Sequence, residues 1–243
     1  MSTLAAHLRY EPAYPVGIHV QPATENRNRL TAAFRVILAI PHILLVGGPL
    51  AATLTWSWTA ETGLRYEWGT GGGALGLVAA VVACLAWFAI VFTGRYPQGL
   101  WNLATLYLSW RVRAVAYTAM LRDEYHPPFG EGPYPVKLEL HAPDAPRDRL
   151  TVAFRIVFVI PHLLAVLVLN LLWALSSLIA WFAILLTGRY PTRLYEFAVG
   201  VFRWNIRVEA YLLLLRDEYP PFLLGHEPAP VAGLPAVQSR STP

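Results

Sequence analysis

Two arginine–histidine pairs inside apolar stretches are the residues best suited to chemistry. Arg35 and His42, like Arg155 and His162, are seven positions apart, which is about two helical turns, so each pair shares one helix face. Ionisable residues are costly inside a membrane and usually face protein or water. In a structural role, each arginine reaches toward the interface and each neutral histidine bonds a neighbouring helix. The functional alternative is a site for a lipid headgroup or a proton.

The two histidines also permit a metal hypothesis. If a two-fold axis related the two stretches, His42 and His162 would face each other at equal depth and could ligate the iron of haem b. No second histidine pair, nearby carboxylate or CxxCH motif supports this arrangement. We therefore expect no cofactor, and keep a bis-histidine haem b protein as the second alternative.

Four further arginines suit contacts with lipid phosphates. Arg95 and Arg189 each lie in a Thr-Gly-Arg-Tyr-Pro block, a pattern that is also typical of a helix end. Arg203 and Arg207, four apart, share one face of an amphipathic segment that would suit the headgroup region. Basic residues near an anionic leaflet contribute about 1 kcal/mol each to membrane attraction. This attraction would anchor the protein without defining an activity.

No catalytic set accompanies these residues. The chain has no GxSxG, HExxH, Walker A or Gly-rich dinucleotide motif, and its apolar spans contain no acidic residue. Proton and cation pathways in membranes usually use Asp or Glu. We therefore expect a protein that is not an enzyme, and we expect no nucleic-acid partner.

Composition indicates that lipid surrounds much of the chain. Of 243 residues, 56% are hydrophobic and only 14% are charged, whereas a soluble domain carries about 25% charged residues. The mean hydropathy is +0.42. The single cysteine, Cys84, excludes an internal disulfide. The polar N-terminal residues lack the apolar core of a cleaved signal peptide, so we expect the first apolar helix to direct insertion.

An internal repeat organises the sequence. Arg-Leu-Thr at 29–31 recurs 120 positions later, whereas Trp-Phe-Ala-Ile at 87–90 recurs 94 positions later, so the first copy holds 26 extra residues. Such repeats define architecture before any other feature. We expect a disordered N-terminus at 1–13, repeat one at 14–129 with an insertion at about 47–73, repeat two at 134–222, and a disordered tail at 225–243.

These elements predict an all-α integral membrane protein made of two tandem helical hairpins. We expect four spans, near residues 30–50, 74–93, 150–168 and 171–187. At 17 to 21 residues, each would rise about 25–32 Å, enough for a hydrocarbon core of about 30 Å. A bend near Asn170 would join the last two, with a re-entrant hairpin as the alternative. A short cytoplasmic strand precedes each hairpin, and an interfacial amphipathic helix follows it.

The insertion has an aromatic pattern of its own. Trp56 and Trp58 alternate with polar residues, as do Tyr66 and Trp68 after a Gly-containing turn, which predicts a β-hairpin with one aromatic face. Tryptophan and tyrosine also form belts at membrane interfaces. The hairpin is therefore either part of such a belt or a surface for a partner.

Charge distribution predicts the orientation. Basic residues cluster before the first span, between the second and third, and after the fourth, whereas the loops inside the hairpins hold only Arg65. By the positive-inside bias, both termini and the central linker face the cytoplasm. We thus expect a multi-pass protein of a bacterial cytoplasmic membrane.

The ordered motifs resemble a known family. Ile-Pro-His, Trp-Phe-Ala-Ile, Thr-Gly-Arg-Tyr-Pro, Arg-Asp-Glu-Tyr and Pro-Pro-Phe occur in this order in both copies. This order is similar to that of the bacterial membrane family known as domain of unknown function four-three-eight-nine, here in two tandem copies. The resemblance supports a fold and implies no activity.

Three hypotheses of function follow. The first is an accessory or scaffold subunit of a bacterial membrane assembly, with a membrane protein partner or a second copy of the chain, and with Trp56, Trp58, Tyr66 and Trp68 as its partner surface. The alternative is a protein that binds or translocates a lipid or small ligand through the arginine and histidine sites. The haem b protein is the second alternative.

Overall fold

The structure is a computed structural model of the 243-residue chain. It describes residues 14–48, 72–125, 134–140, 142–143 and 147–225, and the backbone of two strands at 54–59 and 65–70. The chain ends for which we expect disorder, 1–13 and 226–243, lie outside the described residues.

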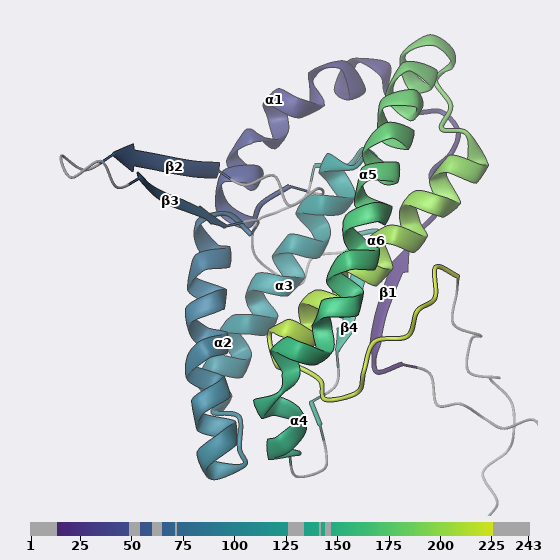
Figure 1. The fold of residues 1–243 in the computed structure, drawn as a ribbon. Helices are drawn as coiled ribbons and strands as arrows, with labels where there is room; N and C mark the ends of the chain where they lie inside the picture. The colour runs from purple at the N-terminus through teal and green to yellow at the C-terminus, as the bar shows by residue number, and fades with distance from the viewer. Residues whose placement is uncertain are drawn as a thin grey trace, which may run out of the picture.

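The described part is mostly helical, with six helices and two separate pairs of strands (Figure 1). In chain order the elements are β1 (Val16–Val20), α1 (Arg29–Val46), β2 (Leu54–Thr59), β3 (Arg65–Thr70), α2 (Gly73–Thr93), α3 (Gln98–Thr118), β4 (Val136–Leu140), α4 (Arg149–Ala153), α5 (Arg155–Thr187) and α6 (Thr192–Leu212).

The helix ends follow the repeated motifs. Asn28 caps α1 by accepting from the Thr31 amide at 3.1 Å, and Asp148 caps α4 by accepting from the Leu150 amide at 3.0 Å. Gly94 and Gly188 terminate α2 and α5 in the left-handed conformation, with φ of 74° and 69°. The Thr-Gly-Arg-Tyr-Pro blocks are therefore helix ends.

Helix α5 is one continuous helix of 33 residues. The predicted bend near Asn170 is wrong, because this stretch holds no glycine or proline and Asn170 exchanges hydrogen bonds with Asn205 of α6 at 3.0 and 2.8 Å. The amide is satisfied inside the fold, so the helix need not leave the apolar layer there. At 1.5 Å per residue, α5 is about 50 Å long.

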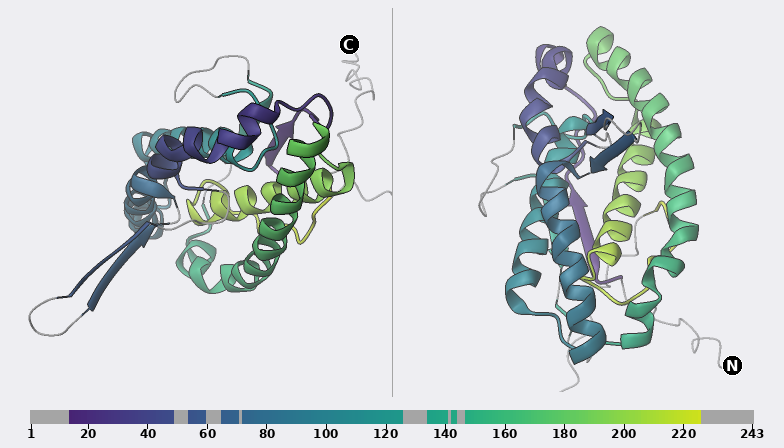
Figure 2. Two further views of the ribbon diagram at one scale, coloured as in Figure 1. Left: turned by 90° about the horizontal axis from the view of Figure 1, so that it is seen from above. Right: turned by 60° about the vertical axis from the view of Figure 1, so that its left-hand side comes forward.

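The 26 extra residues of the first half fall where α5 continues unbroken in the second. They separate α1 from α2 and contain the predicted β-hairpin, in which β2 and β3 pair antiparallel with Trp56 opposite Trp68 and Trp58 opposite Tyr66. The hairpin projects away from the helices (Figures 1 and 2). The side chains of these four residues lie outside the described part of the chain.

The same contacts recur in the two halves. Strand β1 pairs antiparallel with β4, and Ile18 lies opposite Leu138, exactly the offset of 120 found in the sequence. Trp87 donates to the Val152 carbonyl, and its counterpart Trp181 donates to the Ala32 carbonyl, each at 3.0 Å. The end of α2 thus meets α4, the end of α5 meets the start of α1, and these helices frame the molecule (Figure 2).

Helices α3 and α6 lie inside this frame. Most residues of α6 are buried, including Tyr195, Phe202 and Trp204, and α6 packs along α5 while α3 packs against α1 and α2. The apolar face of α6, which the sequence pattern assigned to the headgroup region, is therefore covered by protein. Its amphipathic pattern reflects one face toward α5 and another toward β1.

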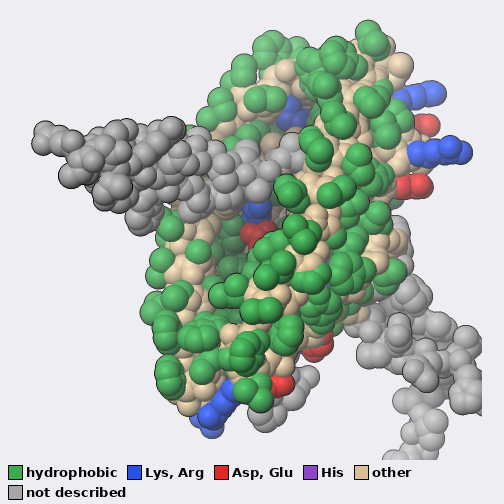
Figure 3. All heavy atoms as spheres, in the orientation of Figure 1, with side chains coloured by type: hydrophobic (Ala, Val, Ile, Leu, Met, Phe, Trp, Pro, Cys, Tyr) green, Lys and Arg blue, Asp and Glu red, His purple; other side chains and the backbone are tan. Residues whose placement is uncertain are grey.

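Among the described residues, three helices are long and apolar enough to cross a membrane, namely α1, α2 and α5, as in a multi-pass membrane protein. In the most apolar 18-residue stretch of each helix, less than a third is buried. The outer faces of these helices therefore expose large hydrophobic side chains (Figure 3). The structure thus has three such helices where the sequence predicted four spans, since the last two form α5.

Candidate functional site

Two buried arginines of the first half, Arg27 and Arg35, form ion pairs with one carboxylate. Arg27 donates to Asp123 from Nε at 2.9 Å and from Nη2 at 2.7 Å, and Arg35 donates to the same carboxylate. Arg35 also donates to the carbonyls of Tyr117 and Arg122, at 2.9 and 2.7 Å. Both arginines are buried, so the pair and its carboxylate form a clamp between the start of α1 and the segment after α3.

The second half repeats this clamp. Arg147 lies 2.7 Å from Asp217, and Arg155 donates to Asp217 at 2.5 Å and to the carbonyls of Tyr211 and Arg216 at 3.0 and 2.8 Å. The hydrogen bonds of Arg35 and Arg155 therefore go to protein groups, which supports their structural role. Sequence reasoning missed Asp123 and Asp217, although the repeated Arg-Asp-Glu-Tyr block marked both positions.

The first clamp predicts a dependence of stability on pH. Burial alone would raise the pKa of Asp123, but hydrogen bonds and charge from Arg27, with charge from Arg35, hold that pKa below its usual value. The stabilising contribution is then complete above the unfolded pKa of about 3.9 and is lost as pH falls through the folded value. We expect the thermal midpoint in detergent to fall more steeply below about pH 4 in the wild type than in Asp123→Asn. Parallel curves would contradict this.

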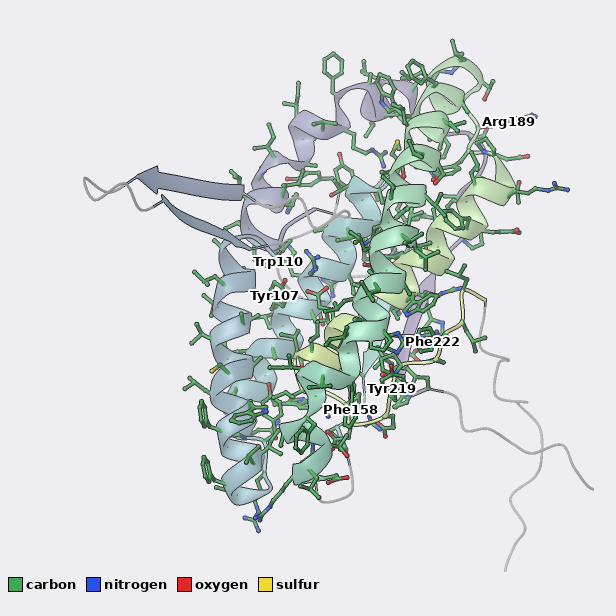
Figure 4. The ribbon with its side chains drawn as sticks, in the orientation of Figure 1. Tyr107, Trp110, Phe158, Arg189, Tyr219 and Phe222 are labelled. Carbon is green, nitrogen blue, oxygen red and sulfur yellow. The ribbon has the colours of Figure 1, made fainter. Side chains whose placement is uncertain are left out.

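The two histidines lie in separate clusters. His42 shares a hydrogen bond of 2.7 Å with the Tyr125 hydroxyl, whereas Nδ1 of His162 accepts from Trp204 Nε1 at 3.1 Å and its ring stacks on Phe222. Figure 4 shows Tyr219 and Phe222 together in the second cluster. The second alternative, a bis-histidine haem b protein, requires the two histidines to face each other, and these contacts hold them against different partners instead.

The remaining arginines divide into exposed and buried pairs. Arg95 and Arg189 are exposed just beyond α2 and α5, and Arg189 points away from the body (Figure 4). Arg203 is buried and donates to the Ile18 carbonyl at 3.1 Å, and Arg207 is buried with its guanidinium 5.8 Å from the Tyr14 ring. Only the first pair is placed to reach lipid phosphates.

A cavity of about 690 Å³ lies between α2, α3, the C-terminal part of α6 and the first turn of α5. One wall is a row of small residues at the start of α2 and along it, namely Gly72, Gly76, Ala79, Ala80 and Ala83. The rest of the cavity lining is mainly aromatic and aliphatic. Cys84, which is exposed, also lines it. A mostly apolar cavity with few polar groups is typical of a small-molecule site.

A polar cluster closes one end of the cavity. The Tyr107 hydroxyl donates to Glu209 at 3.0 Å, and Arg111 donates to the other carboxylate oxygen at 2.6 Å. A Cβ on Gly72 or Gly76 would lie 2.3 or 3.1 Å from the Tyr107 oxygen, so these glycines let the tyrosine reach Glu209. Basic and acidic side chains are visible in the hollow between the apolar ridges of Figure 3.

Larger or apolar residues occupy the matching positions of the other half. Trp173, one of the largest fully buried side chains, stands at the position of Ala79. Val115 and Val201 stand at the positions of Glu209 and Tyr107. The cavity and its polar cluster thus combine residues of both halves, and the symmetry-related positions do not carry the same side chains. Sequence reasoning missed them, although the differences between the copies were the available signal.

The family model described as Domain of unknown function (DUF4389) matches residues 72–130 and 149–223, more than half of the chain. The chain belongs to this family. Its two matched segments contain α2–α3 and α4–α6, and so include every wall of the cavity and both aspartates of the clamps. No curated protein and no solved structure matches the chain.

Proposed function

We propose that this protein binds a membrane lipid or another apolar small molecule and has no catalytic activity of its own. The cavity carries the proposal, because it is large and mostly apolar, and because the symmetry-related positions carry different side chains. No group of three or more His, Cys, Asp or Glu side chains that could hold a metal occurs among the described residues.

The single cysteine provides the test. Cys84 lines the cavity, so a bound ligand should shield its thiol from a maleimide. We expect the protein purified in mild detergent to retain a lipid-sized mass in native mass spectrometry, and delipidation to speed maleimide reaction by about tenfold, as for a ligand bound with at least 1.4 kcal/mol of protection. Absence of a retained mass together with an unchanged rate would overturn the proposal.

We also propose that the protein lies in the bacterial cytoplasmic membrane, with both chain ends facing the cytoplasm. The strands β1 and β4, which carry the exposed pair His19 and Glu139, lie behind α3 and α6, midway along the long axis (Figures 1 and 2). Open sheet edges do not occur in hydrocarbon, so this face belongs in water. The long axis then lies along the membrane, and α1, α2 and α5, although long enough to cross it, enter from one side as in the re-entrant arrangement. The exposed basic ends of α2 and α5 then share the cytoplasmic side.

Labelling tests this orientation. The variants Arg95→Cys and Arg189→Cys are each made on a Cys84→Ser background. Both should react with an impermeant maleimide in inside-out vesicles, and neither should react in intact spheroplasts. Arg95 follows α2 and Arg189 follows α5, and these two helices end at opposite ends of the molecule (Figure 1). Reaction of one from each side would instead mean that α2 and α5 cross the membrane.

An accessory role is a second candidate, and the hairpin β2–β3 favours it. In the described part of the chain this sheet has only two strands, and it projects from the side where the long helices expose apolar residues. Its open edges would be unfavourable in hydrocarbon unless a partner protein or a second copy covered them. Replacing residues 49–71 by a short Gly-Ser linker should release a co-purifying partner while leaving Cys84 shielded; retention of the partner would exclude this role for the hairpin.

A further inference from the structure

The polar end of the cavity is electrically balanced. Of the charged groups there, Glu209 is paired with Arg111, and Arg111 also donates to the Val46 carbonyl. Arg155 lines the opposite end, but its hydrogen bonds go to Asp217 and two carbonyls. A phosphate entering the cavity would therefore meet the Glu209 carboxylate, and the two arginines there are already paired with carboxylates.

The same cluster offers oxygen atoms that can accept hydrogen bonds. Burial, with the charge of Glu209, raises the pKa of Tyr107, so the phenol keeps its proton and donates it to Glu209. The phenol oxygen and the carboxylate oxygens each have further lone pairs. A ligand that donates a hydrogen bond fits this end of the cavity, because these lone pairs can accept it while the existing hydrogen bonds remain.

We propose that the cavity takes an uncharged lipid with a hydroxyl headgroup, which donates to Glu209 or to the Tyr107 oxygen while its chain lies along the small residues of α2. This rests on the proposed function and narrows its ligand. The apolar wall from Gly76 to Ala83 and the aromatic floor at Trp87 and Phe88 accommodate the chain. Anionic phospholipids are less suited to the cavity, because Arg111 is already paired with Glu209, whereas they suit the exposed Arg95 and Arg189.

The test compares two photoactivatable lipids that share their acyl chains and differ in headgroup. Diacylglycerol and phosphatidic acid are each presented to the full chain in phosphatidylcholine nanodiscs, and cross-links to peptides of α2 and α6 are counted by mass spectrometry. We expect diacylglycerol to exceed phosphatidic acid by about tenfold, the worth of one hydrogen bond to a charged group. Glu209→Gln leaves Arg111 without its counter-charge, so the preference should fall by about tenfold or reverse.

Two further variants keep the result decisive. Glu196→Gln changes an exposed acid on the same helix and should leave the preference unchanged. If Glu209→Gln does not fold, Tyr107→Phe removes one acceptor at constant shape and should lower the preference by about threefold, as for one neutral hydrogen bond. Equal labelling by both lipids, unchanged in the variants, overturns the headgroup assignment and leaves the proposed function standing. Absence of cavity labelling by either lipid overturns both.

Discussion

Replacing Asp217 with alanine is expected to lower the free energy of unfolding by about 3–5 kcal/mol, the cost of removing one partner from a buried ion cluster. Arg147 and Arg155 are 8% and 2% exposed, and both direct guanidinium nitrogens at this carboxylate. Without it, two positive charges remain in the interior. Urea or guanidinium unfolding in detergent, followed by the fluorescence of the nine tryptophans, measures the loss.

Matched variants show whether charge is the cause. Asp123→Ala removes the equivalent carboxylate of the first half and should cost a similar amount, because Arg27 and Arg35 are held in the same way. Glu139→Ala breaks the exposed pair with His19 and should cost about 0–1 kcal/mol. Adding Arg155→Met to Asp217→Ala should recover part of the loss, since it removes one uncompensated charge. If Asp217→Ala costs no more than Glu139→Ala, the clamp does not stabilise the fold.

Substituting Ala79 with tryptophan is expected to abolish ligand retention in the cavity. The second half carries Trp173 at the matching position, where it is buried and fills the space. An indole at Ala79 would occupy the cavity in the same way, so we expect the retained lipid to fall by about tenfold or more, the effect of losing several buried apolar contacts. Cys84 should then react with maleimide at one rate, with or without added lipid.

The control places the same side chain on the opposite face of the helix. Leu85 is 53% exposed on α2 and does not line the cavity, so Leu85→Trp should leave lipid retention and Cys84 shielding unchanged. If Ala79→Trp does not fold, Ala83→Leu narrows the cavity with a smaller side chain. Full retention of lipid in both cavity variants would show that the cavity is not the binding site.

The sequence by itself determined the local structure. Capping residues before 29 and 149, glycines at 94 and 188, and apolar runs of helical length set where helices begin and end, because these preferences act over a few residues. The offsets of 120 and 94 predicted the two matching halves and the place of the hairpin insertion. Membrane character followed from composition, since low charge and long apolar runs need no knowledge of packing.

Only the tertiary structure decided how these pieces meet. The continuity of α5 at Asn170 depends on Asn205, which is 35 residues away, and the roles of Arg35 and Arg155 depend on carboxylates more than 60 residues away. The amphipathic face of α6 fits lipid and protein equally well in sequence, and only the presence of α5 settles which covers it. The cavity exists because one half carries small side chains where the other half carries larger ones. This difference in volume leaves a space only when α2, α3, α5 and α6 pack around it.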